Sequence, residues 1–161
     1  KLKMKLIKEI AFASALTLAS LVAMPSAFAH EIKFGDLVIS HPWSRQSPMG
    51  ADVSAGFLKI TNNGAADDKL VSGTAEIAPV VQIHDIKMDG DMMKMFEIEG
   101  GLVIPAGQTV ELKPKAKHIM FMKVAKQPAV DTSFKGTLTF EKAGTVEIEY
   151  EVVDPQATMD H

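Results

Sequence analysis

A histidine and two methionines alternate along one short segment, His118-Ile119-Met120-Phe121-Met122. In a β-strand, the side-chain period of two places His118, Met120 and Met122 on one face and the two apolar residues between them on the other. The apolar face is typical of a buried core. The other face presents an imidazole and two thioethers, which are donors for soft and borderline metal ions.

A second histidine–methionine pair is expected on a β-hairpin. Asp89-Gly90 is a strong signal for a two-residue hairpin turn, and a turn made of these two residues pairs His84 with Met95. Directly opposed side chains of a hairpin point to the same side, with Cβ atoms about 4.5–5.5 Å apart. The sequence therefore predicts that His84 and Met95 are neighbours, although ten residues separate them. A looser turn that included Asp91 would shift this register.

The two pairs together would supply two imidazole nitrogens and two thioether sulfurs to one metal ion, from His84, Met95, His118 and Met120. Thioether sulfur is soft and uncharged, and it prefers Cu(I) to hard cations and to most divalent metals. The sequence contains no Cys, so it cannot form the Cys-ligated site of a blue-copper electron-transfer protein. The donors therefore indicate a protein that carries Cu(I) rather than one that cycles it between oxidation states.

Each donor also has an ordinary structural explanation. Methionine is a flexible filler of hydrophobic cores, and a single histidine in a strand is commonly a packed residue of intermediate burial. Copper binding is favoured by the combination of two His–Met pairs, one of them close to Met88, Met92 and Met93, in a chain without Cys. From the residues alone, a metal-free adhesion or structural domain remains the alternative.

Short segments of alternating polar and apolar residues, separated by turn residues, predict the strands that must position these donors. After residue 29, no segment has convincing helical periodicity over three turns. Many short strands at this spacing indicate a single all-β domain, an antiparallel β-sandwich. The predicted strands are Ile32–Ser40, Ser54–Thr61, Lys69–Ala75, Val80–Met88, Met92–Ile98, Leu102–Ile104, Thr109–Lys113, His118–Val124, Phe134–Glu141 and Thr145–Val153.

Residues 1–29 are typical of a secretory signal peptide. Four lysines precede or adjoin an apolar run from Ile10 to Met24, and Ala27-Phe28-Ala29 is a small-x-small cleavage site. The apolar run is shorter than the roughly 20 residues that span a bilayer, and an uncleaved anchor is the alternative. We therefore expect an exported chain with a copper-binding domain at residues 30–153 and a disordered tail at residues 154–161.

The charge and the missing cysteines argue against several partners. The sequence has 17 basic and 20 acidic side chains; residues 1–29 hold four Lys and one Glu, which leaves 13 basic and 19 acidic side chains. Such an acidic chain is a poor partner for nucleic acid or an anionic membrane. Without Cys, neither a disulfide scaffold nor a lipid-anchored Cys at the cleavage site is expected. No nucleophile or phosphate-binding motif is found, so we expect a non-enzymatic protein. We also expect a monomer without a stable membrane anchor.

Further donors lie near the ends of the predicted mature chain. If cleavage follows Ala29, His30 becomes the N-terminus and offers an amine and an imidazole to Cu(II), alone or together with His41. That would make a secondary Cu(II) site or the His brace of a copper enzyme; a frayed terminus with an incidental histidine is the alternative. Met159 and His161 would be auxiliary donors in the tail, or simply solvated side chains.

The donor spacing resembles the signature of the PCu(A)C family of periplasmic copper chaperones, in which a His, a Met ten residues beyond it and a later His-x-Met bind Cu(I). His84, Met95 and the segment His118-Ile119-Met120 follow that order. The resemblance covers residues 31–153 and includes further motifs: Trp43-x-Arg45, Asp89-Gly90, Ile104-Pro105-Ala106-Gly107 before Leu112-x-Pro114, and the segment LTFEKAG at residues 138–144.

The resemblance implies a Greek-key, cupredoxin-like sandwich in which His84, Met95, His118 and Met120 bind Cu(I) near the surface. It also implies a chaperone in the periplasm of a Gram-negative bacterium. This chaperone would pass Cu(I) towards the dinuclear copper centre of cytochrome c oxidase, directly or through a thiol-bearing assembly factor. A periplasmic copper-resistance or buffering protein of similar fold is the main alternative.

The sequence departs from the family pattern at two places. Met95 and His118 are separated by 22 residues, one more than the family usually has, and the loop Glu99-Gly100-Gly101 can absorb the extra residue. Pro114-Lys115-Ala116-Lys117 replaces the Gly-Gly-aromatic run that commonly precedes the second His. Neither departure removes a donor, but the two lysines add positive charge beside the predicted site.

Overall fold

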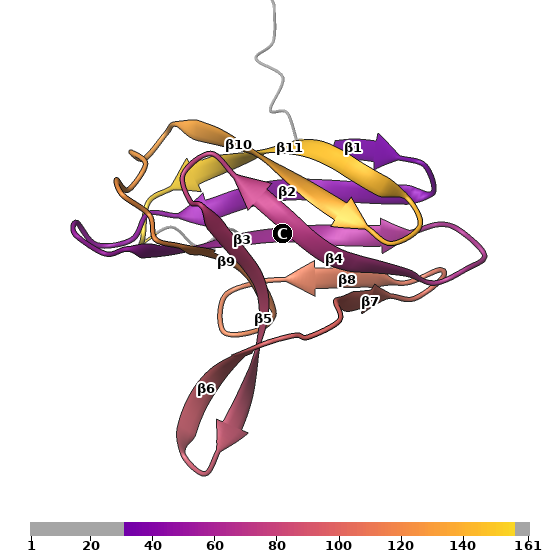
Figure 1. Cartoon of the computed structure of the whole chain (residues 1–161), viewed down its shortest axis with the longest axis horizontal. Helices are drawn as coiled ribbons and strands as arrows, with labels where there is room; N and C mark the ends of the chain where they lie inside the picture. The colour runs from indigo at the N-terminus through magenta and orange to yellow at the C-terminus, as the bar shows by residue number, and fades with distance from the viewer. Residues whose placement is uncertain (1–30, 157–161) are drawn as a thin grey trace, which may run out of the picture.

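The computed structural model describes residues 31–156, and this part of the chain consists of β-strands joined by turns and loops (Figure 1). The predicted all-β class is therefore confirmed. The predicted signal peptide and the donors His30, Met159 and His161 lie outside the described residues. The strands are β1 (Glu31–Phe34), β2 (Leu37–Arg45), β3 (Val53–Asn62), β4 (Asp68–Ala75), β5 (Val80–Asp89), β6 (Met92–Glu97), β7 (Leu102–Ile104), β8 (Thr109–Leu112), β9 (His118–Met122), β10 (Ser133–Phe140) and β11 (Gly144–Val153).

The strands form one hydrogen-bonded sheet in the order β6-β5-β9-β3-β2-β11-β10-β4-β7, with β1 added beside β2 and β8 beside β3. The pairings in this part of the chain are antiparallel except that of β11 with β2. Strands near both ends of this path contribute to a single core, since Ile83 of β5, Leu70 of β4 and Ile104 of β7 belong to one hydrophobic cluster, whereas the residues of β6 are exposed. The sheet therefore closes over itself as a β-sandwich.

Aromatic packing fixes strand β9 from the core side. Tyr150 of β11 is fully buried, and its ring lies 5.2 Å from that of Phe121 and 5.1 Å from that of Phe134, centroid to centroid. Such aromatic pairs contribute about 0.5–1.5 kcal/mol each beyond the area that they bury. Because Phe121 points into this cluster, the period of two turns His118 and Met120 to the opposite face of β9.

The strand predicted at Ile32–Ser40 is instead two strands, β1 and β2, which pair with each other across a tight turn. Phe34 opposes Leu37, and Gly35 in the turn has a φ of +59°, a value that glycine adopts without the clash of a Cβ atom. Apolar residues lie at even positions before the turn, Ile32 and Phe34, and at odd positions after it, Leu37 and Ile39. The prediction of a single strand overlooked this change of phase at Gly35-Asp36.

Strands β5 and β6 form a hairpin that projects away from the rest of the sheet (Figure 1). The first half of β5, from Val80 to His84, pairs with β9, and the second half, from His84 to Asp89, pairs with β6. No helix within residues 31–156 has the length and apolarity of a membrane span.

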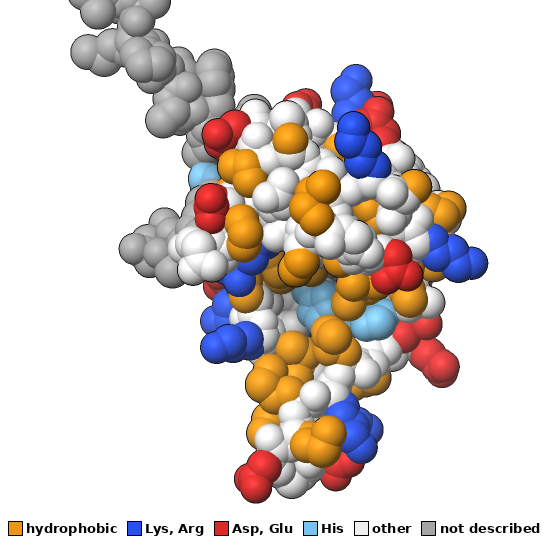
Figure 2. All heavy atoms as spheres, turned by 90° about the vertical axis from the view of Figure 1, so that its left-hand side faces the viewer, with side chains coloured by type: hydrophobic (Ala, Val, Ile, Leu, Met, Phe, Trp, Pro, Cys, Tyr) orange, Lys and Arg blue, Asp and Glu red, His pale blue; other side chains and the backbone are white. Residues whose placement is uncertain are grey.

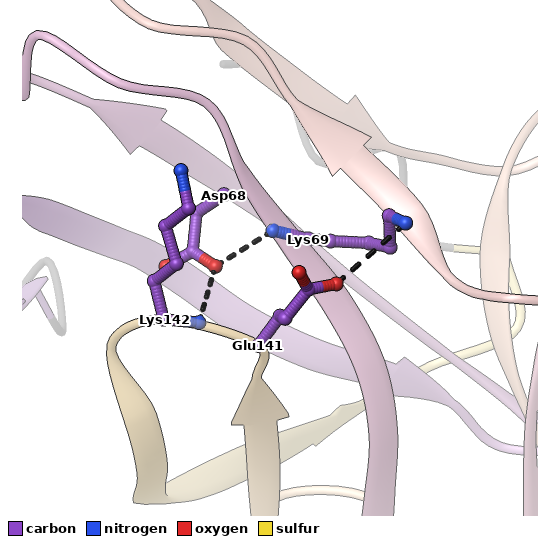
Figure 3. A network of polar contacts seen from close by, with 4 residues as sticks. All are labelled: Asp68, Lys69, Glu141 and Lys142. Carbon is purple, nitrogen blue, oxygen red and sulfur yellow. Dashed lines mark hydrogen bonds and ion pairs between the residues drawn. The ribbon is translucent and has the colours of Figure 1, made fainter.

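Asp68 at the start of β4 anchors the turn between β10 and β11 (Figure 3). Its carboxylate accepts hydrogen bonds from the backbone N–H groups of Lys69 at 2.7 Å, Lys142 at 2.9 Å and Ala143 at 3.0 Å. Burial by itself raises the pKa of Asp68, but these backbone hydrogen bonds, together with the positive charge of Lys142, outweigh it and hold the pKa below the ordinary value of 3.8. An ion pair of 3.6 Å between Lys69 and Glu141 adds to the same connection.

Candidate metal centre

His84 of β5 and His118 of β9 lie side by side because they are directly paired residues of neighbouring antiparallel strands. Their ring centroids are 5.7 Å apart, with an angle of 48° between the ring planes. Histidine nitrogens bind metal ions at about 2.0–2.1 Å, so two rings at this separation are close enough to share one ion. The fold thus brings together the two histidines predicted as metal ligands, which are 34 positions apart in the sequence.

Hydrogen bonds hold each imidazole in one tautomer and leave its other nitrogen with a lone pair. His118 donates from Nδ1 to the carbonyl oxygen of Ala116 at 2.8 Å, so the lone pair of the neutral ring lies on Nε2. His84 donates from Nε2 to Oε1 of Gln82 at 2.8 Å. Its Nδ1 is buried and has no hydrogen-bond partner among the described residues. This is the arrangement of metal-binding histidines, which almost always donate their second ring N–H to an oxygen acceptor.

Electrostatics keeps His84 in the neutral form that a metal requires. Burial and the neighbouring imidazole of His118 lower the pKa of His84 below its ordinary value of 6.5, although the carboxylate of Glu97 opposes this shift. Because ligation needs an unprotonated imidazole, His84 is ready to bind at neutral pH without first losing a proton.

Met120 joins the histidines from strand β9. It lies two residues beyond His118, so both side chains share one face of the strand, and it opposes Gln82 of β5. Met120 is half-buried and, together with His118 and Met95, lines a cleft of about 460 Å³. The cleft therefore collects one imidazole and two thioethers at its wall, with the second imidazole directly beside the first.

The predicted pairing of His84 with Met95 is wrong: His84 pairs with Glu97, and Met95 pairs with Ile86. The turn consists of Gly90 and Asp91, not of Asp89 and Gly90, since Asp89 pairs with Met92. Gly90 has a φ of +62°, as expected for the first central residue of a type II′ turn. The alternative turn would require a positive φ at Asp89, which a non-glycine residue adopts less readily.

The corrected register still leaves Met95 on the histidine face of the hairpin. The shift is two residues, and a shift of two preserves the face to which each side chain points. Met95 is therefore a diagonal neighbour of His84 rather than a direct one, at the Cβ separation of roughly 7–8 Å that long side chains can bridge. Its side chain is 57% exposed, so this donor is on the solvent side of the cleft.

The hollow at this site is visible where the projecting hairpin meets the body of the sheet. Figure 2 shows histidine side chains in the hollow, bordered by hydrophobic side chains of both parts. Arg45, Pro48 and Phe57 also line the cleft. Within residues 31–156, no three His, Cys, Asp or Glu side chains converge on a common point, so a metal ion at the histidine pair would need the thioethers as further donors.

The two lysines before His118 have different environments. Lys117 forms an ion pair of 3.3 Å with Asp85, which offsets its charge near the histidine pair. Lys115 lines the cleft and has a φ of +64°.

Of the other predicted copper donors, His41 lies on β2 and lines a separate cleft with Trp43 and Lys113.

Gln82 was not identified from the sequence, although it shares the strand face of His84 two residues away. Its side-chain oxygen fixes the tautomer of His84. If His84 binds a metal ion, replacing Gln82 with Leu is expected to weaken that binding by roughly 10–100-fold, the usual effect of losing a group that orients a metal ligand. Competition with a chromophoric Cu(I) chelator would measure this loss. Gln82→Glu keeps an acceptor oxygen and should retain most of the affinity; equal losses in both variants would contradict the orienting role.

Comparisons with known proteins place this site in context. A family model described as LpqE-like putative lipoproteins matches residues 37–152. The putative lipoprotein Lxx21020 of Leifsonia xyli subsp. xyli is 28% identical over 116 residues, which make up 72% of this chain and 69% of that relative.

Solved structures of PCuAC domains share the fold. The copper-bound PCuAC domain from PmoF2 is 26% identical with a TM-score of 0.67, over 78% of this chain and 99% of that domain. The apo PCuAC domain from PmoF1 is 28% identical with a TM-score of 0.67, over 78% of this chain and all of that domain. The Cu(I) form of DR1885 from Deinococcus radiodurans, at 21% identity and a TM-score of 0.56 over 78% of this chain and 81% of its own, is alike in fold.

Proposed function

We propose that this chain binds copper. The chain belongs to the family of LpqE-like putative lipoproteins, because that family's model matches residues 37–152 of its 161 residues. His84, Met95, His118 and Met120 are the proposed ligands of one Cu(I) ion. The observation that carries the proposal is the histidine pair: two adjacent imidazoles, each with one nitrogen hydrogen-bonded to an oxygen and the other left with a lone pair. The similarity to a copper-bound PCuAC domain supports the same metal.

The donor types favour Cu(I) over other ions. Two thioethers are soft, uncharged ligands, whereas Ca²⁺, Mg²⁺ and Mn²⁺ prefer oxygen donors. With two neutral imidazoles and two neutral sulfurs, the bound ion keeps a net charge near +1. A thiolate on a partner protein would therefore replace one of these neutral donors favourably, because it adds a negative charge to a cationic centre.

The exposure of the site is suited to transfer of the ion. His118 is only 4% exposed, whereas Met95 is 57% exposed, so the rigid nitrogen side is inside and a flexible sulfur donor is outside. An incoming ligand can approach through the cleft and displace Met95 without disturbing the histidine pair. We therefore propose a metallochaperone that carries Cu(I) and hands it to another protein.

The acceptor we propose is a copper protein outside the cytoplasm, namely cytochrome c oxidase at its dinuclear copper centre or a thiol-bearing assembly factor. The signal peptide predicted at residues 1–29 supports export. The description of the matching family and relative as lipoproteins is consistent with a protein at the outer side of the cytoplasmic membrane.

A titration of the protein with Cu(I) under reducing conditions, read by X-ray absorption, tests the ligand set. We expect a first equivalent bound by two nitrogen and two sulfur donors. Met120→Leu keeps an apolar side chain of similar volume and should weaken the first equivalent by more than about tenfold, since even groups that only orient a ligand change affinity by roughly 10–100-fold. Met122→Leu, on the same strand, should leave it unchanged. An absorption spectrum without sulfur donors would overturn the assignment.

A further inference from the structure

The projecting half of the β5–β6 hairpin exposes methionines that the four-ligand site does not use. Met88 is 63% exposed, Met92 65% and Met93 51%. A hairpin surrounded by solvent is ordinarily covered by polar side chains, and large exposed apolar side chains that gather in one place mark a binding site. These methionines therefore require an explanation of their own.

The register of the hairpin separates the exposed methionines onto two faces. Met88 of β5 pairs directly with Met93 of β6, and Ile86 pairs with Met95. All of these lie on the face that carries His84 at its base, because positions two apart on a strand share a face. Met92 pairs with Asp89 and lies on the reverse face.

The charges of the hairpin lie mainly on the reverse face. Lys94 forms an ion pair with Asp89 there, and the ammonium group of Lys87 lies 5.5 Å from the ring centroid of Phe96. On the histidine face, the charged side chain is Glu97, opposite His84 at the base of the hairpin. Apart from Asp91 in the turn, the outer end of that face therefore presents thioethers and an aliphatic side chain, with no charged side chain from the two strands.

We propose that Met88 and Met93 form a second Cu(I) site at the outer end of the hairpin, made of thioethers alone. Directly opposed residues have Cβ atoms about 4.5–5.5 Å apart, and each methionine has three rotatable bonds with which to direct its sulfur. Soft, uncharged sulfur selects a soft monovalent ion. The preference for Cu(I) follows from these sulfur donors. The outer site rests on the proposed function only because both sites would bind the same ion.

The outer site is continuous with the inner one through Met95. This residue lies two positions from Met93 on the same face of β6 and is a diagonal neighbour of His84. A Cu(I) ion bound to Met88 and Met93 can therefore gain Met95 as a third ligand, then lose the outer sulfurs as the imidazoles bind. Each step adds or releases a neutral donor, so the charge of the complex does not change; copper remains Cu(I) and no electron is transferred. The outer pair would bind more weakly, as it lacks imidazole, and would serve as the loading or release end of the route.

Matched variants of the full chain test the outer site. The double variant Met88→Leu with Met93→Leu removes both sulfurs while keeping apolar side chains of similar volume, and Met92→Leu makes the same change on the reverse face. In an anaerobic Cu(I) titration, the unchanged protein and Met92→Leu should bind a second, weaker equivalent. The double variant should keep the first equivalent and lose the second.

Spectra of the ¹³C-labelled methionine methyl groups identify the sulfurs involved. The second equivalent should shift the methyl signals of Met88 and Met93 and leave those of Met92 and of Met49, which is 90% exposed. The absence of a second equivalent, or equal shifts of all exposed methionines, would overturn the outer site and leave the inner one intact. Shifts of Met88 and Met93 without any binding at the histidines would instead support the outer site while the proposed inner ligand set failed.

Discussion

Replacing His118 with Asn is expected to lower the affinity for the first Cu(I) equivalent by at least about 100-fold, since loss of a ligand should exceed the 10–100-fold effect of losing a group that orients one. The amide of Asn lies near the position of the imidazole Nδ1, so it can still donate to the carbonyl of Ala116. Nε2, the nitrogen with the free lone pair, has no counterpart in Asn. Chelator competition under reductant would measure the change.

His41 supplies the matched control for this substitution. It lines a different cleft and has a φ of +51°, a conformation that Asn tolerates better than most residues. His41→Asn should therefore bind the first Cu(I) equivalent as the unchanged protein does, and both variants should unfold within a few degrees of it without metal. If His118→Asn retained full affinity, or if His41→Asn lost as much, the histidine pair would not be the copper site.

Asp68→Asn is expected to reduce the free energy of unfolding at pH 7 by about 1–3 kcal/mol, the usual range for leaving buried hydrogen-bonding groups unsatisfied. The carboxylate accepts three backbone N–H groups, two at Oδ1 and one at Oδ2. An Asn side chain has a single acceptor oxygen, so at least one of these N–H groups would face another donor. Urea unfolding with a linear extrapolation would measure the difference.

The pH dependence of this effect has a definite sign. Because the pKa of Asp68 is lowered in the folded protein from an ordinary value of 3.8, its charge stabilises the fold above that value, and this contribution is lost as the pH falls through the lowered pKa. The unchanged protein should therefore lose stability below about pH 4, and the gap to Asp68→Asn should narrow there. Asp67→Asn, which alters one exposed hydrogen bond to Ala106, should have a much smaller effect at every pH. A gap that stayed constant down to pH 2 would contradict this role of the charge.

Local periodicity predicted most strands to within a few residues, because burial on one side of a sheet imposes a period of two on the sequence. The prediction missed the turn at Gly35-Asp36, where the apolar positions change from Ile32 and Phe34 to Leu37 and Ile39, because the neighbouring apolar Val38 obscures this shift of one residue. The hairpin turn shows a related limit. The segment Asp89-Gly90-Asp91 permits two turns, Asp89-Gly90 and Gly90-Asp91. The structure has the second, in which the positive φ of the first turn residue falls on Gly90.

The sequence by itself determined the residue types of the proposed donors and, for one pair, their common face: His118 and Met120 share it through the period of two. His84 and Met95 share a face because the turn has two residues, and a register error of two residues left this unchanged. The absence of Cys and the choice of thioethers were likewise readable without a structure. These properties are local, so they do not depend on how the chain folds over long distances.

Only the tertiary structure decided which strands are neighbours. The pairing of β5 with β9 places His84 directly beside His118, and no local rule relates two strands separated by β6, β7 and β8. The same pairing ends halfway along β5, which leaves Met88 and Met93 on a hairpin outside the core. Strand order is set by the packing of the whole apolar core, to which strands from β5 to β7 of the sheet path contribute, and that packing is a property of the complete chain rather than of any one segment.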